Sequence, residues 1–359
     1  MGYLGMIGSF WPREKRSCVL SIILVFLVLL ICFFNDPNLL SGIACAIMAN
    51  QSSEAGTPSV ILRLAHGEKL EHPTHTVAEE VAQEIRNKTN GRIAVEVYGN
   101  MQFGQEIELV KMVQKGTLDF AIVSAASLSS FAHVMNIWEL PYLFNSEEQA
   151  NQALDGEPGQ YVLKSLAESE LTGISYWENG FRSITTRSIQ VKKPGDLLDL
   201  HIWVMQNPID IAFFTKLAAV PTSMDWGEVI PALKRGIIEG QENSIPIIYT
   251  NELGKYQQYL TLSEHTFDPL VVLTGNSLHT KLSPTEMKMI FSLLQDARFR
   301  QRRLIAERNK YYLAKIRSSK MTVITPENDS FRRVGREFSK EALKLFDPVV
   351  RAYFERYLQ

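Results

Sequence analysis

Apolar residues in the first part of the chain follow two spacings in turn, and these predict alternating strands and helices. Three segments show the short apolar or alternating pattern of strands: 60–65, 93–98 and 118–124. Two segments between them show helical spacing: one carries Val77, Val81 and Ile85, and the other spans 106–115. The resulting βαβαβ order is typical of an open α/β domain.

A single long helix is predicted nearer the C-terminus. Ser283 has the N-cap position, Pro284 the first helical position, and Glu286 completes a capping box. No Gly or Pro follows before Pro326, so the helix is expected to reach about Ser318, roughly 50 Å at 1.5 Å per residue. That length exceeds the width of a small domain, so the helix must lie across more than one. An arginine cluster on it is expected to be a solvated face rather than a nucleic-acid surface: Arg298, Arg300, Arg302, Arg303 and Arg308.

The N-terminus has the pattern of an export signal. Basic residues precede an apolar run at 18–34, and small residues follow near 44–49. The run also reaches the lower limit for a membrane span, so an uncleaved anchor is the alternative. Either way, the body of the protein is expected outside the cytoplasm. All three cysteines lie in this leader, so the body has neither a disulfide framework nor a thiol nucleophile: Cys18, Cys32 and Cys45.

Composition and motifs exclude several functions. The hydrophobic fraction of 45% and charged fraction of 21% are those of a globular protein, and a formal net charge of −2 gives no electrostatic reason to expect nucleic-acid binding. His72 and His75 lack a nearby cysteine or third histidine, so no metal site is expected. The common hydrolase, metalloprotease and phosphate-binding motifs are missing from the sequence, and no cofactor is expected.

The most informative segment is WGEVIPALKRGIIEGQEN, residues 226–243. It predicts a short amphipathic helix that ends at Gly236, then a short strand at Ile237 and Ile238, then a turn at 240–243. Asn243 would thus follow the end of a strand, which is where α/β sheets usually present a ligand.

This segment resembles one in the solute-binding proteins of TRAP transporters, the DctP family. The matching residues are Gly227-Glu228-Val229, Ala232-Leu233, Gly236 and the GQEN run, and the stretches LAHGEKLEHP and LPYLF also have counterparts. The resemblance covers about residues 60–345. It implies an α/β, two-lobe periplasmic-binding-protein type II-like fold with a long helix spanning both lobes. It also implies a periplasmic monomer that delivers a small organic solute to membrane permease subunits, binds no nucleic acid and is not an enzyme.

The resemblance gives expected domain bounds. Residues 1–49 would be the signal peptide or an inner-membrane anchor at 18–34, and 50–58 a linker. Lobe I would comprise 59–180 with about 265–300, and lobe II 181–264 with about 301–345. Residues 346–359 would form a C-terminal tail helix.

Several ligand-binding residues are implied by the same resemblance. Arg182, in the run Asn-Gly-Phe-Arg, matches an arginine that reaches the pocket from the second lobe, and an arginine fork suits a carboxylate. Trp203 stands where the family has its main clamp arginine, and an indole cannot form that bidentate salt bridge. Gln206 and Asn243 match hydrogen-bonding partners of the ligand.

Two further candidates come from strand ends in the first lobe. Ser124 and His66 both lie at the expected carboxyl edge of the sheet, although a lone histidine there is more often structural.

Two neighbouring residues change the expected chemistry of the site. Asp225 adds a carboxylate, as either a helix N-cap or a ligand contact, and Trp226 adds an aromatic wall that could stack on a ring, a sugar face or a cationic group. We therefore predict that simple dicarboxylates are not bound in the family's usual manner. The alternative functions are a membrane-tethered ligand sensor of the same fold and, less favoured, an enzyme on a two-lobe scaffold.

Overall fold

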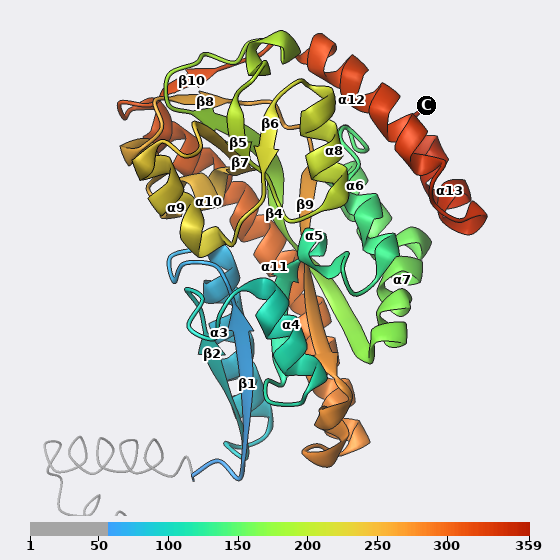
Figure 1. Cartoon of the computed structure of the whole chain (residues 1–359). Helices are drawn as coiled ribbons and strands as arrows, with labels where there is room; N and C mark the ends of the chain where they lie inside the picture. Colours follow the sequence, from blue (N-terminus) through green and yellow to red (C-terminus); the bar gives the residue numbers. More distant parts are fainter. Residues whose placement is uncertain (1–56) are drawn as a thin grey trace, which may run out of the picture. The chain divides into compact units, whose positions relative to one another are not determined.

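A computed structural model describes residues 57–359, which contain one mixed ten-stranded sheet flanked by helices (Figure 1). Its main path runs in the order β2 (Ile93–Tyr98), β1 (Val60–His66), β3 (Phe120–Ser124), β9 (Phe267–Gly275), β4 (Leu171–Thr186), β7 (Gly240–Ser244), β5 (His201–Trp203), β6 (Val220–Thr222). Two short strands lie beside this path: β8 (Tyr259–Thr261) and β10 (Thr322–Ile324). None of the helices within residues 57–359 is long and apolar enough to cross a bilayer. The predicted signal or anchor lies outside the described residues.

Strand β4 joins two halves of the sheet. The first half contains β2, β1, β3 and β9, and the second contains β7, β5, β6, β8 and β10. From Leu171 to Phe181 it pairs antiparallel with β9, whereas from Arg182 onward it pairs with β7 and β8. The register with β9 shifts between Glu178 and Gly180, and Gly180 has a φ of +90°, a conformation that favours glycine. The chain therefore passes from one half to the other along a continuous strand.

The first half has the predicted βαβαβ order. The observed elements match their predicted bounds closely, except that β3 begins two residues later than expected. Helix α3 (Pro73–Lys88) follows β1, and helices α4 (Glu106–Gln114) and α5 (Ala125–Leu128) lie before and after β3 in the chain. Strand β1 pairs parallel with β2 and β3, while β3 pairs antiparallel with β9. The β3 residues are buried on both faces, as a continuous apolar run predicts.

The second half surrounds β5, β6 and β7 with three helices: α8 (Pro208–Lys216), α9 (Trp226–Arg235) and α10 (Ile245–Thr250). The α9 prediction is confirmed, because the helix ends at Gly236 with a φ of +71°. The next prediction is wrong. Gly240–Ser244 is itself the fully buried strand β7, and Ile237 and Ile238 precede it. Its backbone gains ladder partners on both sides, β4 and β5, which outweigh the weak strand propensity of Gly, Gln, Glu and Asn.

The long helix is confirmed as α11 (Pro284–Arg317), with the Ser283–Glu286 capping box in place and Ser318 at its C-cap. It packs against α3 and β4 and, further along, against α10 and β10, so it runs along both halves (Figure 1). Its arginine cluster is only partly solvated. Arg302 is buried, with its guanidinium 2.7 Å and 3.0 Å from the carboxylate oxygens of Asp155, because this helix face packs inward.

The C-terminal segment also contacts the first half. Helices α12 (Asn328–Leu343) and α13 (Pro348–Phe354) form one arm in Figure 1, with α6 (Glu147–Asp155) and α7 (Glu157–Lys164) beside it. Phe354 is fully buried, and its ring centroid lies 5.2 Å from that of Trp138. The tail is thus part of a hydrophobic core.

Candidate functional site

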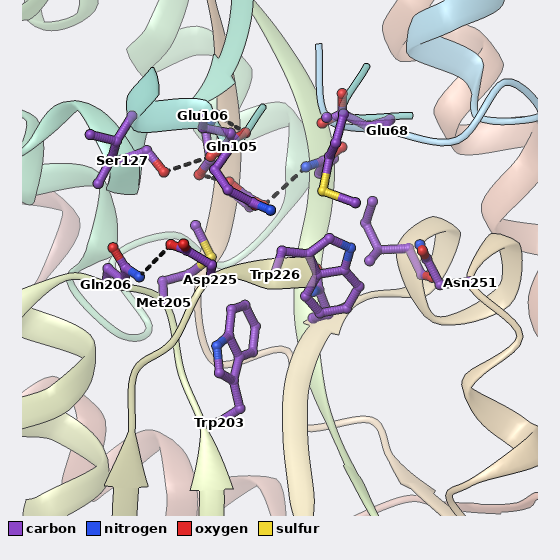
Figure 2. A pocket seen from close by; sticks show the side chains of 18 of the residues that line it. Glu68, Gln105, Glu106, Ser127, Trp203, Met205, Gln206, Asp225, Trp226 and Asn251 are labelled. Carbon is purple, nitrogen blue, oxygen red and sulfur yellow. Dashed lines mark hydrogen bonds between the residues drawn. The ribbon is translucent and has the colours of Figure 1, made fainter. Parts of the chain in front are cut away.

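One pocket receives residues from both halves of the sheet (Figure 2). It holds about 780 Å³, counted out to its opening into solvent. From the first half it is lined by Gly67, Glu68, Met101, Gln105, Glu106, Ile107, Ser124 and Ser127. From β4, β9 and the second half it is lined by Asn179, Arg182, Trp203, Met205, Gln206, Met224, Asp225, Trp226, Asn243, Ile247, Asn251 and Asp268.

The pocket brings together seven of the eight side chains proposed from the sequence, and His66 is the exception. His66 is 1% exposed, its Nε2 lies 3.0 Å from Nδ1 of His75, and its Nδ1 lies 3.1 Å from Oε2 of Glu68. His66 does not line the pocket. It contacts Glu68, which does line the pocket.

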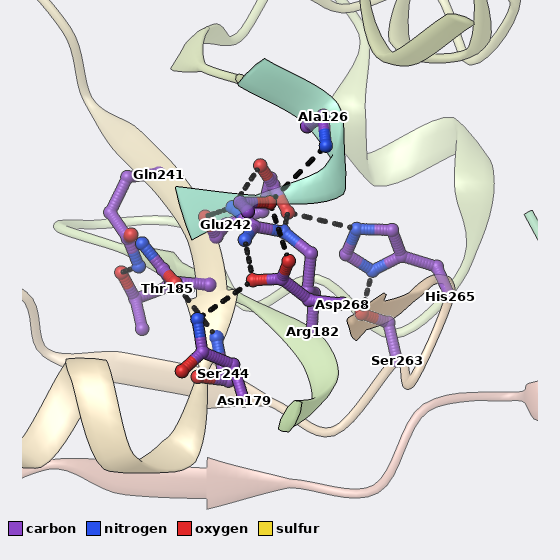
Figure 3. Close-up of polar contacts among 12 residues, drawn as sticks. Ala126, Asn179, Arg182, Thr185, Gln241, Glu242, Ser244, Ser263, His265 and Asp268 are labelled. Atoms are coloured by element: carbon purple, nitrogen blue, oxygen red, sulfur yellow. Dashed lines mark hydrogen bonds and ion pairs between the residues drawn. The ribbon is translucent and has the colours of Figure 1, made fainter. Parts of the chain in front are cut away.

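Arg182 faces the pocket but is already engaged by the protein (Figure 3). Its Nε and Nη2 donate to the two carboxylate oxygens of Glu242 at 2.6 Å and 2.8 Å, and Nη2 also donates to the Glu242 carbonyl at 2.9 Å. Its Nη1 donates to Oδ2 of Asp268 at 2.9 Å. Of the five donors of a guanidinium, these bonds leave one on Nη1. The fork is therefore not free to clamp a ligand carboxylate.

Other buried acids lie near the ion pair of Arg182 and Glu242. Burial opposes ionisation of Glu242, but the Arg182 charge and the hydrogen bond from His265 outweigh it and lower the pKa of Glu242. Burial and the neighbouring carboxylates raise the pKa of Glu139 and of Asp210 well above their usual values. The environment thus favours the protonated form of those two acids, while Arg182 and Glu242 form a buried ion pair.

The two indoles form an aromatic wall. Trp203 is 3% exposed, and its Nε1 donates to the Met224 carbonyl at 2.9 Å. Its ring centroid is 5.2 Å from that of Trp226, with 55° between the planes. Because the Trp203 donor is used within the protein, this residue offers the pocket its ring surface rather than a hydrogen bond.

Asp225 has the N-cap position of α9, but its side chain makes no capping hydrogen bond. Its Oδ1 instead accepts a hydrogen bond from Nε2 of Gln206 at 3.0 Å, and both side chains are exposed on the pocket wall (Figure 2). The carboxylate is therefore available at the pocket surface.

Sequence reasoning missed two acids on the opposite wall. Glu68 follows the end of β1 and is 6% exposed, and its Oε2 has no partner in hydrogen-bond geometry. Burial opposes its ionisation, but the nearby His66 and the charge of His72 lower the pKa of Glu68. The available signal was its place just beyond a strand at the carboxyl edge of the sheet.

Glu106 is the second missed acid. Its Oε1 accepts from the Ser124 backbone N–H at 2.9 Å and its Oε2 from the Ser127 hydroxyl at 2.5 Å. Burial and the charge of Glu68 raise the pKa of Glu106 to about 7, although the two serine bonds favour the ionised form. Two hydrogen bonds hold the carboxylate in place at the first turn of α4.

The remaining polar groups are amides and a hydroxyl. Ser124 donates to Oδ1 of Asp268 at 2.6 Å, and Asn179 Nδ2 donates to Oδ2 at 3.1 Å, so Asp268 is fully engaged. Asn179 Oδ1 is buried without a partner, and Asn243 Oδ1 accepts only from the Ser244 N–H at 3.0 Å. Within residues 57–359, no group of three or more His, Cys, Asp or Glu side chains is arranged to hold a metal ion.

Comparison with known proteins relates most of the described residues to one family. The model for "bacterial extracellular solute-binding protein, family 7" matches residues 64–345. The 2,3-diketo-L-gulonate-binding periplasmic protein of Escherichia coli K12 is 28% identical over 264 residues, 74% of this chain and 80% of that protein. The C4-dicarboxylate-binding protein of Bacillus subtilis is 25% identical over 307 residues, 86% of each chain.

A solved structure agrees in fold. The TRAP periplasmic solute-binding protein of Roseobacter denitrificans, with bound L-galactonate, has a TM-score of 0.79 and 25% identity, covering 85% of this chain and 100% of that chain. The predicted α/β, two-lobe fold is confirmed by this similarity.

Proposed function

Because the chain belongs to the bacterial extracellular solute-binding proteins of family 7, we propose that it is the extracytoplasmic solute-binding component of a TRAP-type transporter. It captures a small organic solute in the pocket and delivers it to membrane permease subunits. The observation that carries this proposal is a pocket whose walls come from both halves of the sheet. Such a pocket couples binding to the relative position of two lobes.

The lobes are assigned from the exchange of partners along β4. Lobe I comprises 59–180 with about 265–300, and lobe II comprises 181–264 with about 301–345, since β4 leaves β9 after Phe181 and joins β7 at Arg182. Two elements lie along both lobes: β4 and α11. Bending at the Glu178–Gly180 irregularity would let the lobes close on a solute and open to release it.

The solute is not a simple dicarboxylate held in the family's usual way. Trp203 occupies the clamp position, and its only donor is bound to Met224. Arg182 has one donor left, so neither residue offers the two parallel bonds that a carboxylate accepts from a free guanidinium.

A thermal-shift screen tests this proposal. Succinate, malate and fumarate should leave the melting temperature nearly unchanged, whereas the molecule that copurifies with the protein should raise it, because a ligand that binds only the folded state stabilises it. Identification of that molecule by mass spectrometry gives the solute directly. Strong stabilisation by succinate, retained after Trp203→Leu, would contradict our interpretation of the clamp position.

Binding without turnover separates this function from an enzyme. After prolonged incubation with the protein, the copurified solute should be recovered chemically unchanged. A new product, formed in proportion to protein concentration and time, would identify an enzyme on the same fold. The N-terminal sequence of the mature protein distinguishes a released binding protein from one tethered through residues 18–34.

A further inference from the structure

The pocket wall carries an excess of negative charge. Among its lining residues, all within residues 57–359, there are four carboxylates and one guanidinium: Glu68, Glu106, Asp225, Asp268 and Arg182. Arg182 forms one ion pair with Asp268 at 2.9 Å and a second with Glu242, so its charge is neutralised within the protein. What remains for a ligand is Glu68, Asp225 and Glu106, of which Glu106 is only partly ionised near pH 7, and Arg182 is the one cation among the lining residues and is already paired. A carboxylate solute would enter a site that repels it.

Glu68 shows where a positive charge is missing. Its side chain is 5% exposed, and Oε2 has no donor in hydrogen-bond geometry, although Nδ1 of His66 lies 3.1 Å away. His66 stabilises the ionised form of Glu68, but a buried carboxylate that receives no hydrogen bond of good geometry still gains from a further positive charge or donor. Since Glu68 lines the pocket, a solute can supply that charge or donor.

The positive end of helix α9 does not reverse this balance. A helix N-terminus attracts anions, but Asp225 already holds the N-cap position of α9 and puts a carboxylate there. Glu106 likewise takes the Ser124 N–H and the Ser127 hydroxyl as its own donors. The Ser124 and Ser127 donors, which could have bound an acidic solute, are therefore used by one of the protein's own acids.

The aromatic wall opposite these acids also favours a positively charged ligand. Figure 2 shows Glu68 and Glu106 on one side of the pocket and the indoles of Trp203 and Trp226 on the other. Indole is the best cation–π partner among side chains, and two rings 5.2 Å apart present adjacent faces. A neutral apolar solute could use the rings alone, but it would leave the acids unpaired.

We propose that the solute is a small organic cation, whose protonated or quaternary nitrogen lies between the carboxylates of Glu68 and Glu106 and the indoles of Trp203 and Trp226. This inference rests on the proposed solute-binding function and specifies its substrate class. The nitrogen is attracted by the acids, while its alkyl or aromatic substituents cover the rings and the nearby methionines. Asp225 and Gln206 form the polar rim of the same pocket.

Matched probes of equal shape and different charge test this proposal. Isothermal titration of the full chain would use two sets: benzylamine, benzyl alcohol and benzoate; and choline, dimethylbutanol and dimethylbutyrate. Within each set, the cation should bind about 10-fold or more tightly than the neutral probe, and the carboxylate most weakly.

Variants assign the preference to the acids. Glu68→Gln and Glu106→Gln keep the side-chain shape and should each weaken cation binding by roughly 10- to 150-fold, with little effect on the neutral probes. Glu341→Gln is the matched control, because that carboxylate is exposed on α12, away from the pocket. Melting curves of the variants confirm that they are folded.

Each outcome decides between the proposals. If a carboxylate or neutral probe binds more tightly than its cation, or if the copurified solute is an anion, the cation inference is overturned and the solute-binding function stands. A cation preference that survives both Glu→Gln changes also overturns it. If no probe binds and no solute copurifies, both the inference and the proposed function fail.

Discussion

At the scale of single residues, we expect Trp203 to influence which ligand class the pocket accepts. Trp203→Arg adds a guanidinium at the clamp position, and we expect affinity for succinate and other carboxylates to rise by roughly 10- to 150-fold, the value of one charge-assisted bond. Affinity for the copurified solute should fall, because the ring surface is lost. Titration of both ligands measures this.

Val220→Arg is a suitable control, since it adds the same charge on the neighbouring strand β6, where Val220 is 38% exposed and does not line the pocket. If Trp203→Arg changes neither ligand class, Trp203 only packs within lobe II and the assignment of the clamp position is wrong.

We expect Arg182 to affect stability more than affinity. The sequence alone favours a ligand-binding fork, but the structure pairs Arg182 with Glu242 and Asp268, all three buried. Arg182→Ala would leave two buried carboxylates without their partner, and we expect a loss of about 3–5 kcal/mol in the free energy of unfolding. Urea denaturation measures it. The loss should shrink at acidic pH, because the lowered pKa of Glu242 depends on Arg182 and the stability that it contributes is lost as Glu242 is protonated.

Arg303→Ala provides the comparison, because Arg303 is exposed on α11 and its removal should change stability by less than about 0.5 kcal/mol. Equal effects of the two substitutions would show that the buried network contributes nothing to stability.

Sequence reasoning reached these residues unevenly, for a physical reason. Gln206 was found from the resemblance to the DctP family, and Asp225 from a departure from that family's pattern, both within short contiguous stretches. The partners of Arg182 were not, because Asp268 is 86 positions away and only the pairing of β4 with β9 brings it close. Glu68 lay in a recognised stretch, but its burial, which makes it important, depends on tertiary packing that the sequence does not display.

At the scale of elements, α11 and β4 cross at a buried polar contact. Gln301 is fully buried on α11; its Oε1 accepts from the Glu178 N–H at 3.0 Å, and its Nε2 donates to the Glu178 carbonyl at 2.6 Å. These bonds satisfy the strand backbone next to its irregularity at Gly180. The helix thereby satisfies backbone groups of β4 at an irregularity within its pairing with β9.

The Glu178 side chain makes this crossing sensitive to pH. Burial, reinforced by the charge of Glu147, raises the pKa of Glu178 from 4.5 to about 7. In the unfolded chain the acid releases its proton near its ordinary value, so between about pH 4.5 and 7 the folded state binds more protons. Stability therefore falls as pH rises through this window, and the cost is fully present above it.

Glu178→Gln should remove that cost. We expect the variant to be more stable than the wild type at pH 8, by up to about 3 kcal/mol, and to lose the advantage near pH 4. Chemical denaturation across this pH range measures the difference. Glu168→Gln, at an exposed carboxyl, should follow the wild-type curve. A constant difference at all pH values would exclude titration as the cause.

Element prediction succeeded where local chemistry sets the structure. The bounds of α11 follow from its capping box and the lack of Gly or Pro, and those of α9 from Gly236. Strand β7 was missed because its residues are poor strand formers individually. Only the ladders on both of its sides, from β4 and β5, specify it.

At the scale of the whole molecule, the C-terminal tail completes the core of the first half. Phe354→Ala should cost about 3–5 kcal/mol, because it empties a fully buried site against Trp138. Solute affinity should change little, since Phe354 does not line the pocket. Thermal unfolding and titration give the two values.

Val349→Ala, on the same helix at 48% exposure, should affect neither. A large loss of solute affinity in a folded Phe354→Ala protein would instead show that the tail governs the relative position of the lobes.

The close pair of indoles also gives the protein an optical property. Of its five tryptophans, Trp138 and Trp177 are buried in core clusters, Trp11 lies outside the described residues, and only Trp203 and Trp226 line the pocket. Two chromophores with centroids 5.2 Å apart couple electronically, so a solute lying against them alters both the emission spectrum and the near-ultraviolet circular dichroism. Occupancy can then be followed in the native, unlabelled protein on the time scale of stopped-flow mixing.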